Sequence, residues 1–540
     1  MSSVKLLDCT LRDGAYLVDK TFGNETIVGI IEGLVKCKID YIEVGFFQDE
    51  GFGEGKTVFR NSADAKKIIP KKKENSLFTV LADYSRYSLA NLDQCRTDSI
   101  DAIRECFFKE ERFEAIDACK KIKEKGYKVF VQPVDILGYT DMELLEFLHN
   151  VNEVEPYCFS IVDTFGSMYQ EDLQHCFDII DHNLVSTCKI GFHSHNNMQL
   201  SSALSQEFVR MSTGKRDIVI DGTISGMGRG AGNTPTELIA QYLISRWGCT
   251  YDMDALLDII DNYMDNIRTR CSWGYNTSYF IAGSYGAHVN NIQYLLGKSS
   301  IQSKDIRYIL NTIGEMQRKR YDYALLEKTY VEHLMSIVDD SLGISELKRS
   351  LGDKDILIIA PGSTATDQLD IIRRYIQLQS PVIISINFIH EQLNADYVYM
   401  SNIKRYSQWI NREEFIKHKK ILASNIKQCA EDETEIIVSF SRLIKCGWEH
   451  MDNSTILLLR LLDEIGVKSI AVAGFDGYGD SGTKQTNYAT EDLEKITVRE
   501  NAVRLNEEIS SMLRDYKMTR EHPNTLVTFV TSSRFEKIFE

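Results

Sequence analysis

Two histidines separated by one residue are the side chains of this sequence best placed to do chemistry as a pair. His193 and His195 come directly after residues 188–192, which read Cys-Lys-Ile-Gly-Phe. Because alternate residues of a β-strand turn to the same face, a strand here presents both imidazoles on one side of its C-terminal end. Two neutral imidazoles on one face can hold one divalent metal ion. The pair alone is equally compatible with two ordinary histidines.

A cluster of charges near the N-terminus supplies what the histidine pair lacks. Residues 4–8 are a short, mostly apolar run, and residues 8–14 read Asp-Cys-Thr-Leu-Arg-Asp-Gly. Asp13 is therefore a candidate third ligand. Two imidazoles and a carboxylate leave an octahedral ion with several open positions, which suits Mn²⁺, Mg²⁺ or Co²⁺ better than a closed structural zinc. We expect Mn²⁺ first among these ions.

The open positions on such an ion indicate which substrate would fit. A 2-oxo acid can chelate the ion through its carboxylate and ketone oxygens, and polarisation of the ketone then stabilises an enolate. Arg12, beside Asp13, is placed to support the developing negative charge with its fixed fork of N–H donors. The alternative is that Arg12 forms a structural ion pair with Asp13 or Glu43. Both interpretations of Arg12 stay open.

Short apolar runs alternate with stretches of helical period along the first half of the chain. The helical stretches include residues 26–37, 111–125 and 141–151. Eight β-α units are the pattern of a (β/α)8 TIM barrel, and a doubly wound sheet is the alternative. The predicted strands are residues 4–8, 41–44, 77–81, 99–107, 128–132, 158–162, 189–192 and 217–220.

Polar residues gather at the predicted strand ends, where TIM barrels place their active sites. A glycine-rich stretch, residues 222–233, also follows the last of these strands. It either brings backbone N–H groups close to an anionic ligand or closes the barrel with a tight turn. The strand-end residues are Arg12, Asp13, Glu43, Gly45, Asp83, Gln132, Asp163, Thr164, His193, His195 and Asp221.

Three motifs together resemble a known family. Residues 8–14, the His-Ser-His-Asn-Asn of residues 193–197 and the Gly-Met-Gly-Arg-Gly-Ala-Gly-Asn of residues 226–233 resemble the DRE-TIM metallolyase superfamily, which is HMG-CoA lyase-like. The most similar branch is the 4-hydroxy-2-oxovalerate aldolases, and the resemblance covers residues 4–295.

The resemblance implies roles for individual residues. It makes Asp13, His193 and His195 the metal ligands and Arg12 the stabiliser of the enolate. It also implies that Thr164 holds the substrate carboxylate and that Tyr285 lies near the reacting aldehyde. Glu43 and Asn196 are expected to contact the substrate.

One departure from the family pattern affects proton transfer. The aldolases carry a catalytic histidine shortly after the Arg-Asp-Gly, and here Ala15 and Tyr16 take that place. Tyrosine has an unperturbed pKa near 10, so Tyr16 is a poorer base at neutral pH unless the metal or Arg12 lowers its pKa. We therefore expect Tyr16 to carry the proton, or the acceptor aldehyde to differ.

Beyond the barrel, assigned to residues 1–250, the pattern predicts two further parts. Residues 251–350 look helical and are expected to complete the barrel mouth and act as a linker. Residues 351–540 read as a second, Rossmann-like α/β domain with a helical tail from residue 493. Its Pro-Gly-Ser-Thr turn at residues 361–364 is a weak signal for a nucleotide or phosphorylated ligand. The domain loosely resembles Rossmann-like domains of glycan-biosynthesis proteins.

Charge and composition exclude several classes of protein. The net charge of −16 over 540 residues offers no basic surface for nucleic acid or an anionic membrane. The N-terminus has no signal-peptide pattern and no apolar segment is long enough to span a bilayer, so a cytoplasmic protein is expected. The 12 cysteines contain no Cys-x-x-Cys pair, which argues against a disulfide framework or a zinc knuckle.

The combined prediction is a divalent-metal-dependent, class II aldolase that joins or splits pyruvate and an aldehyde, in surface-glycan or sugar-acid biosynthesis. A Claisen-type acyl-CoA synthase or lyase of the same superfamily is one alternative, disfavoured because no basic site for the CoA phosphates is evident. A degenerate barrel that serves as a binding scaffold is another: the missing histidine favours it, and the intact triad opposes it. A homo-oligomer is compatible with all three.

Overall fold

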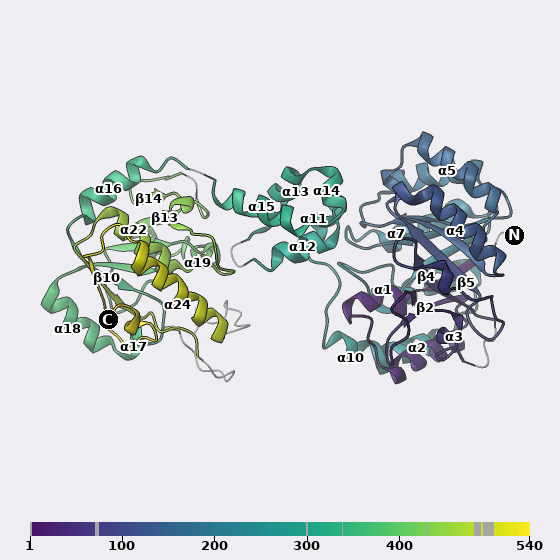
Figure 1. Cartoon of the computed structure of the whole chain (residues 1–540), viewed down its shortest axis with the longest axis horizontal. Helices are drawn as coiled ribbons and strands as arrows, with labels where there is room; N and C mark the ends of the chain where they lie inside the picture. The colour runs from purple at the N-terminus through teal and green to yellow at the C-terminus, as the bar shows by residue number, and fades with distance from the viewer. Residues whose placement is uncertain are drawn as a thin grey trace. The chain divides into compact units, whose positions relative to one another are not determined.

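A computed structural model describes residues 3–70, 75–298, 301–336, 338–427, 429–479, 488–489 and 502–540. The chain divides into two compact units, each with its own parallel sheet (Figure 1). The first unit comprises Met1–Gln293 and Ile306–Asp322, and the second comprises Tyr294–Asp305 and Tyr323–Glu540.

The first unit contains a closed barrel of eight parallel strands. Strand β1 pairs with β9 on one side and with β2 on the other, so the sheet closes on itself. The two-residue strand β3 (Val58–Phe59) extends β2 outside the ring. The predicted TIM barrel is confirmed, and the doubly wound alternative for this part is wrong. The barrel strands are β1 (Val4–Asp8), β2 (Tyr41–Phe47), β4 (Leu77–Asp83), β5 (Ala102–Phe107), β6 (Lys128–Pro133), β7 (Cys158–Asp163), β8 (Lys189–Ser194) and β9 (Ile218–Gly222).

Helices cover the outside of the barrel (Figure 1). Helix α5 shows why they form: Thr140 and Glu143 make a capping box at its start, and Leu144, Phe147 and Val151 form a buried stripe. The longer helices are α2 (Asn24–Cys37), α4 (Arg112–Glu124), α5 (Asp141–Val154), α6 (Gln170–Asn183), α7 (Ser201–Ser212), α8 (Thr236–Trp247) and α9 (Met253–Ile259). Shorter turns are α1 (Thr10–Asp13), η1 (Gly14–Leu17), α3 (Ser62–Ala65), η2 (Leu89–Asn91), η3 (Lys109–Glu111), η4 (Ile136–Gly138), η5 (Ile224–Gly226) and η6 (Ile260–Met264).

The barrel interior changes from apolar to charged along the strands. One inward layer is an apolar cluster that includes Leu7, Tyr41, Ala102, Phe130 and Val219. Because side chains alternate along a strand, the residues two positions further on also face inward. These residues are Cys9, Glu43, Arg104, Gln132 and Asp221, and all are buried. The side chains that face inward at the C-terminal end of the barrel are therefore mostly polar or charged.

Helix α11 (Thr277–Ser284) lies on the strand-end loops of the barrel. A Cβ atom at Gly283 would approach the carbonyl oxygen of Gly166 to 3.0 Å and the Cβ of Asn197 to 3.1 Å. Only glycine permits this close contact. The other helices of this region are α10 (Asp265–Arg268), α12 (Val289–Leu296), α13 (Ser303–Ile313), α14 (Glu315–Lys319), α15 (Tyr323–Leu334) and α16 (Ser341–Leu351).

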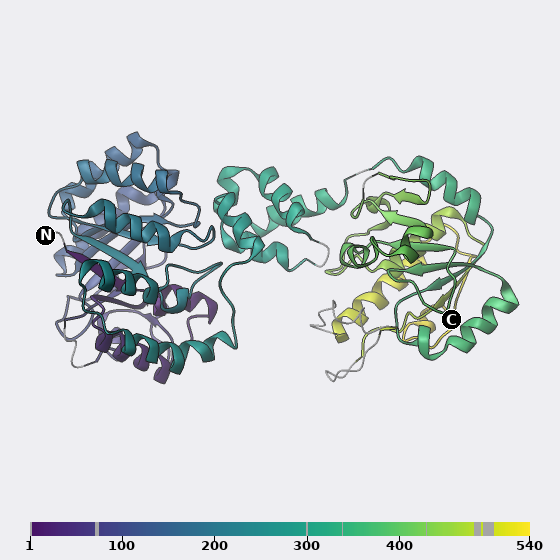
Figure 2. The same cartoon turned by 180° about the vertical axis from the view of Figure 1, so that it is seen from behind.

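The described residues of the second unit form a seven-stranded parallel sheet in the order β14-β13-β12-β11-β10-β15-β16. Helix α24 passes in front of this sheet in Figure 1 and behind it in Figure 2. The strands are β10 (Asp355–Ile359), β11 (Val382–Ile386), β12 (Tyr397–Met400), β13 (Lys419–Ala423), β14 (Glu435–Val438), β15 (Ser469–Ala473) and β16 (Leu526–Phe529). The helices are α17 (Thr364–Asp367), α18 (Leu369–Gln379), α19 (Ile403–Trp409), α20 (Glu413–Lys417), α21 (Phe440–Leu443), α22 (Ser454–Ile465), α24 (Ala502–Thr519) and η7 (Glu536–Ile538).

This sheet confirms the predicted second α/β domain, but its tail differs from the prediction. The tail from residue 493 was expected to be helical, and residues 493–501 lie outside the described part of the chain. Helix α24 is followed by β16, which pairs in parallel with β15. Its Leu-Val-Thr-Phe sequence is rich in β-formers, and a free edge of the sheet was available to it.

Among the described residues, no helix combines the length and the apolar character needed to cross a membrane.

Candidate metal centre

The three predicted ligands meet at the C-terminal end of the barrel. Strands β1, β9 and β8 are consecutive in the ring, which places Asp13, after β1, beside His193 and His195 at the end of β8. The Oδ2 atom of Asp13 lies 3.3 Å from Nε2 of His193 and 3.5 Å from Nε2 of His195. One ligand atom from each residue thus lies close enough to the other two to share one ion.

The second nitrogen of each histidine is already occupied. Nδ1 of His193 lies 3.0 Å from the carboxylate of Asp221, and Nδ1 of His195 donates to the carbonyl oxygen of Asp163 at 3.0 Å. These acceptors favour a proton on Nδ1 of each ring, and each Nε2 atom faces Asp13. Nε2 of His193 is buried and has no hydrogen-bond partner among the described residues. Outer acceptors of this kind orient histidine ligands at metal sites.

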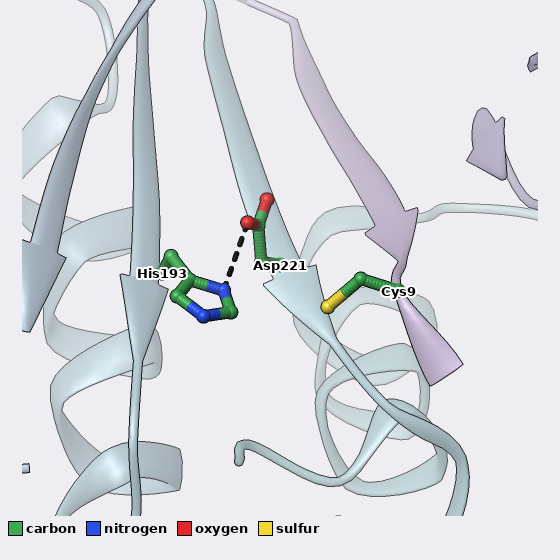
Figure 3. A group of neighbouring side chains, drawn as sticks. All are labelled: Cys9, His193 and Asp221. Atoms are coloured by element: carbon green, nitrogen blue, oxygen red, sulfur yellow. Dashed lines mark ion pairs between the residues drawn. The ribbon is translucent and has the colours of Figure 1, made fainter. Parts of the chain in front are cut away.

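A neighbouring group, Cys9, His193 and Asp221, has metal-ligand residue types but a different role. Figure 3 shows the three side chains on adjacent strands, with the His193 ring directed at the Asp221 carboxylate. The Cys9 thiol donates to the carbonyl oxygen of Gly222 at 3.4 Å, and burial raises the pKa of this thiol well above its usual value. Because metals bind the thiolate, this group supports His193 and is a poor metal site.

Asn233 lies next to this group, because its backbone forms an isolated β-bridge with that of His195. Its Oδ1 atom is buried and, within the described part of the chain, without a hydrogen-bond partner. A Cβ atom at Gly228 would lie 2.2 Å from Nδ2 of Asn233 and 3.2 Å from Oδ1 of Asp13, so this glycine lets the two side chains approach. Carboxylate and imidazole are donors that suit Mn²⁺, Mg²⁺ or Co²⁺. The orphaned Nε2 atom of His193 therefore fits such an ion, and sequence reasoning missed Asn233 although it ends the glycine-rich stretch.

Arg12 is held rigidly beside this group. Its Nη1 atom donates a hydrogen bond to the Asp13 carboxylate and its Nε atom donates one to the Glu43 carboxylate, both at 2.7 Å. Burial alone would lower the pKa of Arg12, but Glu43 and Asp13 raise it well above its usual value. Burial likewise opposes ionisation of Asp13, yet Arg12 and the two histidines hold the pKa of that carboxyl well below its usual range. The ion pairs considered for Arg12 are thus both present, and they fix its position.

A buried charge network extends below the ligands. Arg104, which has no exposed surface, donates to Glu43 at 3.0 Å and also pairs with Asp221. The network runs from Arg12 through Glu43, Arg104 and Asp221 to His193. With Asp13 included, the network has three carboxylates (Asp13, Glu43 and Asp221) and two guanidinium groups (Arg12 and Arg104). The excess of one negative charge favours a bound cation. A charged residue inside the predicted strand 99–107 was the signal that could have identified Arg104.

Tyr16 lies in η1, shortly after the proposed ligand Asp13 in the chain. Its ring packs edge-on against Phe46, with ring centres 5.3 Å apart, and the guanidinium carbon of Arg229 lies 3.4 Å from the Tyr16 ring centre. Burial raises the pKa of Tyr16, although Arg229 and Arg12 oppose the shift. The phenol is therefore protonated at neutral pH, so the lowered pKa considered from sequence does not arise among these residues.

The other predicted residues have local partners. The Thr164 hydroxyl accepts from the backbone N–H of Asp135 at 2.8 Å, and the Asn196 amide oxygen accepts from the Ser201 hydroxyl at 2.8 Å. Tyr285 follows α11, and its ring centre is 5.4 Å from the guanidinium carbon of Arg318. The predicted roles of Thr164, Asn196 and Tyr285 toward substrate stay predictions.

In the second unit, residues 361–364, the turn predicted to bind a phosphorylated ligand, donate hydrogen bonds to the carboxylate of Asp476. The backbone N–H of Thr364 donates to Asp476 at 2.9 Å, and the hydroxyls of Thr364 and Ser363 donate to the same carboxylate. These donors are therefore engaged within the unit, and a nucleotide or phosphorylated ligand stays a prediction.

Comparisons with known proteins find a family model and several distant relatives that match part of the chain. A family model described as HMGL-like matches residues 3–262. The oxaloacetate decarboxylase of Mycobacterium tuberculosis is 24% identical over 321 residues, which cover 56% of this chain and 89% of that protein. The 4-hydroxy-2-oxovalerate aldolase of Pseudomonas putida is 24% identical over 355 residues, with coverage of 60% and 94%. Among solved structures, the HMG-CoA lyase of Bacillus subtilis is 16% identical, covers 50% of this chain and 93% of its own, and has a TM-score of 0.39.

Proposed function

Because the N-terminal half of this chain is an HMGL-like domain, we propose that the protein is a divalent-metal-dependent aldolase that joins or splits pyruvate and an aldehyde. The observation that carries the proposal is the convergence of Asp13, His193 and His195, with both Nδ1 atoms held by outer acceptors. The relatives named 4-hydroxy-2-oxovalerate aldolase support it at low identity.

The proposed metal ligands are Asp13, His193 and His195, and Asn233 pairs with His195 through its backbone. When bound, a divalent ion supplies Lewis-acid polarisation of a carbonyl oxygen, and Mn²⁺ is the first expectation. The remaining work falls to side chains of the chain itself.

Arg12 stabilises the negative charge that develops on the 2-oxo acid. Its ion pairs to Asp13 and Glu43 hold the guanidinium in place before the substrate arrives, so little reorganisation is needed as the charge grows. The Thr164 hydroxyl accepts from Asp135 and retains its own proton, which it can donate to the substrate carboxylate.

Tyr16 serves as the proton carrier at the aldehyde oxygen. In the addition direction the new C–C bond leaves an alkoxide, and the phenol, protonated at neutral pH, donates its proton to that oxygen. Cleavage is the reverse of this step: Tyr16 first loses its proton to solvent, which its raised pKa disfavours at neutral pH, and the phenolate then takes the proton of the hydroxyl group as the C–C electrons return to the 2-oxo acid fragment. Tyr285 is proposed to lie near the aldehyde from the α11 side.

The proposal is tested by incubating the Mn²⁺-loaded protein with pyruvate and a panel of aldehydes, and by following both pyruvate loss and 4-hydroxy-2-oxo acid formation. We expect pyruvate loss that depends on the aldehyde and stops when the metal is chelated. The absence of any aldehyde-dependent loss of pyruvate across the panel would overturn the proposal.

Decarboxylation of a 2-oxo diacid is the second candidate function, favoured by the similarity to the oxaloacetate decarboxylase. Here the C–C bond to the leaving carboxylate breaks, its electrons form the same enolate, and carbon dioxide departs. Release of carbon dioxide from oxaloacetate without any aldehyde, faster than in an Asp13→Ala variant, distinguishes it from aldol chemistry.

A further inference from the structure

Two arginines at the barrel mouth lack a carboxylate partner. Arg229 and Arg318 are half-buried, and neither forms an ion pair with any described residue. Nε of Arg318 is fully covered and has no hydrogen-bond partner in the part of the chain that the structure describes. Covered guanidinium groups are normally paired, because removing their charge from water is costly. Arg318 therefore has a covered donor that an anion from outside the chain can satisfy.

Arg229 extends from the loop that carries the metal-site residues. It follows Gly228, where a Cβ would lie 3.2 Å from Oδ1 of Asp13, and precedes Gly230, where a Cβ would lie 3.0 Å from Val289. Its guanidinium group lies over the Tyr16 ring at 3.4 Å. A guanidinium held by its face against a ring keeps its N–H groups, which point outward in the plane, available for a carboxylate or phosphate.

His288 adds a neutral donor beside this arginine. Its Nδ1 accepts from the backbone N–H of Asn290 at 3.1 Å, so the proton of the neutral ring is on Nε2. Burial lowers the pKa of His288 to about 3, and Arg229, His195 and Arg86 add to this shift. His288 is thus an uncharged side chain with an N–H donor at Nε2.

Arg318 is tied to the same segment. Its carbonyl oxygen accepts from the backbone N–H of His288 and from the side chain of Asn291, both at 2.8 Å, and its guanidinium carbon lies 5.4 Å from the Tyr285 ring centre. Arg86, the third arginine of this region, contacts Asp83 at 3.5 Å. Arg86 thus has a carboxylate partner, whereas Arg229 and Arg318 have none among the described residues.

We propose that the acceptor aldehyde carries a terminal anionic group, a carboxylate or a phosphate, which Arg229 binds with help from His288 and Arg318. This inference rests on the proposed aldolase function and names the substrate class of that site. Tyr16, stacked under Arg229, then lies between the bound anion and the ligand loop, which places its hydroxyl near the aldehyde end of the substrate.

The first test compares matched aldehydes in the presence of pyruvate and Mn²⁺. Glyceraldehyde is paired with glyceraldehyde 3-phosphate, and propanal with succinic semialdehyde, so the two pairs separate a phosphate from a carboxylate. We expect kcat/KM to be roughly 10- to 100-fold higher for the charged member of one pair, the usual worth of a charge-assisted hydrogen bond. Equal kcat/KM within both pairs would overturn the inference.

The second test uses Arg229→Met, which keeps an unbranched side chain and removes the guanidinium group with its charge. The ratio of charged to neutral kcat/KM should fall toward one, while KM for pyruvate stays within about twofold. The matched control is Arg210→Met, an exposed arginine paired with Glu207 on α7, which should keep the wild-type ratio. If Arg229→Met instead raises KM for pyruvate, Arg229 holds the pyruvate carboxylate and the inference is wrong.

A binding experiment separates this inference from the aldolase proposal. Calorimetric titration of the Mn²⁺-loaded protein with glycerol 3-phosphate, succinate and glycerol requires no turnover. We expect one of the two anions to bind, glycerol not to bind, and the binding to be lost in Arg229→Met but kept in Arg210→Met. Anion binding that depends on Arg229 without turnover of any aldehyde would refute the aldolase function and leave the anion site standing. Anion binding unchanged in Arg229→Met would refute the site.

Discussion

At the scale of single residues, each ligand histidine has two nitrogens with separate tasks. Nδ1 of His193 and of His195 is held by an acceptor, and each Nε2 faces Asp13. Arg12 likewise uses two of its donor groups for carboxylates before any substrate is present. The chemistry therefore depends on individual atoms, and substitutions that remove one atom or one geometry are the informative ones.

His195→Ala should abolish stoichiometric metal binding, because it removes one of three clustered ligand atoms. Metal analysis should give about one Mn²⁺ per chain for the wild type, and a small fraction of that for the variant. The thermal midpoint of the metal-free protein should change little. His182→Ala, on the exposed side of α6, is the control and should keep its metal. A fully metal-loaded His195→Ala protein would contradict the assignment.

Arg12→Lys should lower kcat far more than it raises KM. Lysine keeps the charge, but it cannot reach Asp13 and Glu43 and also present a fixed fork to the substrate. A loss of about 100-fold in kcat is expected for a group that acts on the transition state. Steady-state kinetics at saturating Mn²⁺ measures the changes in kcat and KM separately. A variant with wild-type kcat would restrict Arg12 to its ion pairs.

Tyr16→Phe should slow aldol turnover by about 100- to 10,000-fold, the usual worth of a positioned acid or base. The phenyl ring keeps the contacts with Phe46 and Arg229, so the loss isolates the hydroxyl group. Metal content measured on the same preparation should be unchanged, because no ligand is touched. If the variant retains its rate, Tyr285→Phe becomes the decisive variant for the proton path.

At the scale of elements, the loops after parallel strands and helix α11 assemble the site together. Strands β1, β8 and β9 supply Asp13, the histidines and Asp221, and α11 packs against the loops after β7 and β8 through Gly283. An element can therefore control activity without contributing a ligand.

Gly283→Val should disturb this packing. Even a Cβ atom would come within 2.9 Å of the Met198 side chain and 3.0 Å of the Gly166 oxygen, so α11 must shift. We expect kcat/KM to fall by about tenfold or more, as displaced positioning residues typically cause, while Mn²⁺ stoichiometry is retained. Ser284→Ala, at an exposed neighbouring position, is the control. Wild-type kinetics in Gly283→Val would show that the packing of α11 against these loops does not affect turnover.

At the scale of the whole molecule, the chain contains two units with separate sheets and separate cores. The three proposed metal ligands all belong to the first unit. In the second, Asp476 joins the ends of β10 and β15 by accepting from Ser363 and Thr364. Each unit can therefore be perturbed through its own interactions.

Asp476→Ala should destabilise the second unit by about 1–3 kcal/mol, since it leaves covered donors of Thr364 and Ser363 without an acceptor. Differential scanning calorimetry should show one transition moved to lower temperature, while Mn²⁺ affinity is unchanged. Asp367→Ala, exposed in the same turn, should leave both quantities at wild-type values. A loss of Mn²⁺ binding in Asp476→Ala would contradict the independence of the two units.

The amino-acid sequence alone determined the barrel and the grouping of the three proposed ligands. The eight strands could be located because alternation and helical period are local properties of the chain. Asp13, His193 and His195 could be grouped because each follows a strand, and a parallel barrel brings all strand ends to one face. The same local signals identified the parallel strands of the second unit, although not β16, whose pairing depends on a free sheet edge.

Only the tertiary structure decided which buried charges are partners. Arg104 and Asp221 are 117 residues apart and meet because the barrel closes with a particular register, a property that no local pattern encodes. The position of the Asn233 amide nitrogen depends on the close approach that Gly228 permits. Likewise, the pairing state of Arg229 depends on how residues that are distant in sequence pack around it. Periodicity is a property of a segment, whereas the surroundings of a side chain are a property of the folded whole.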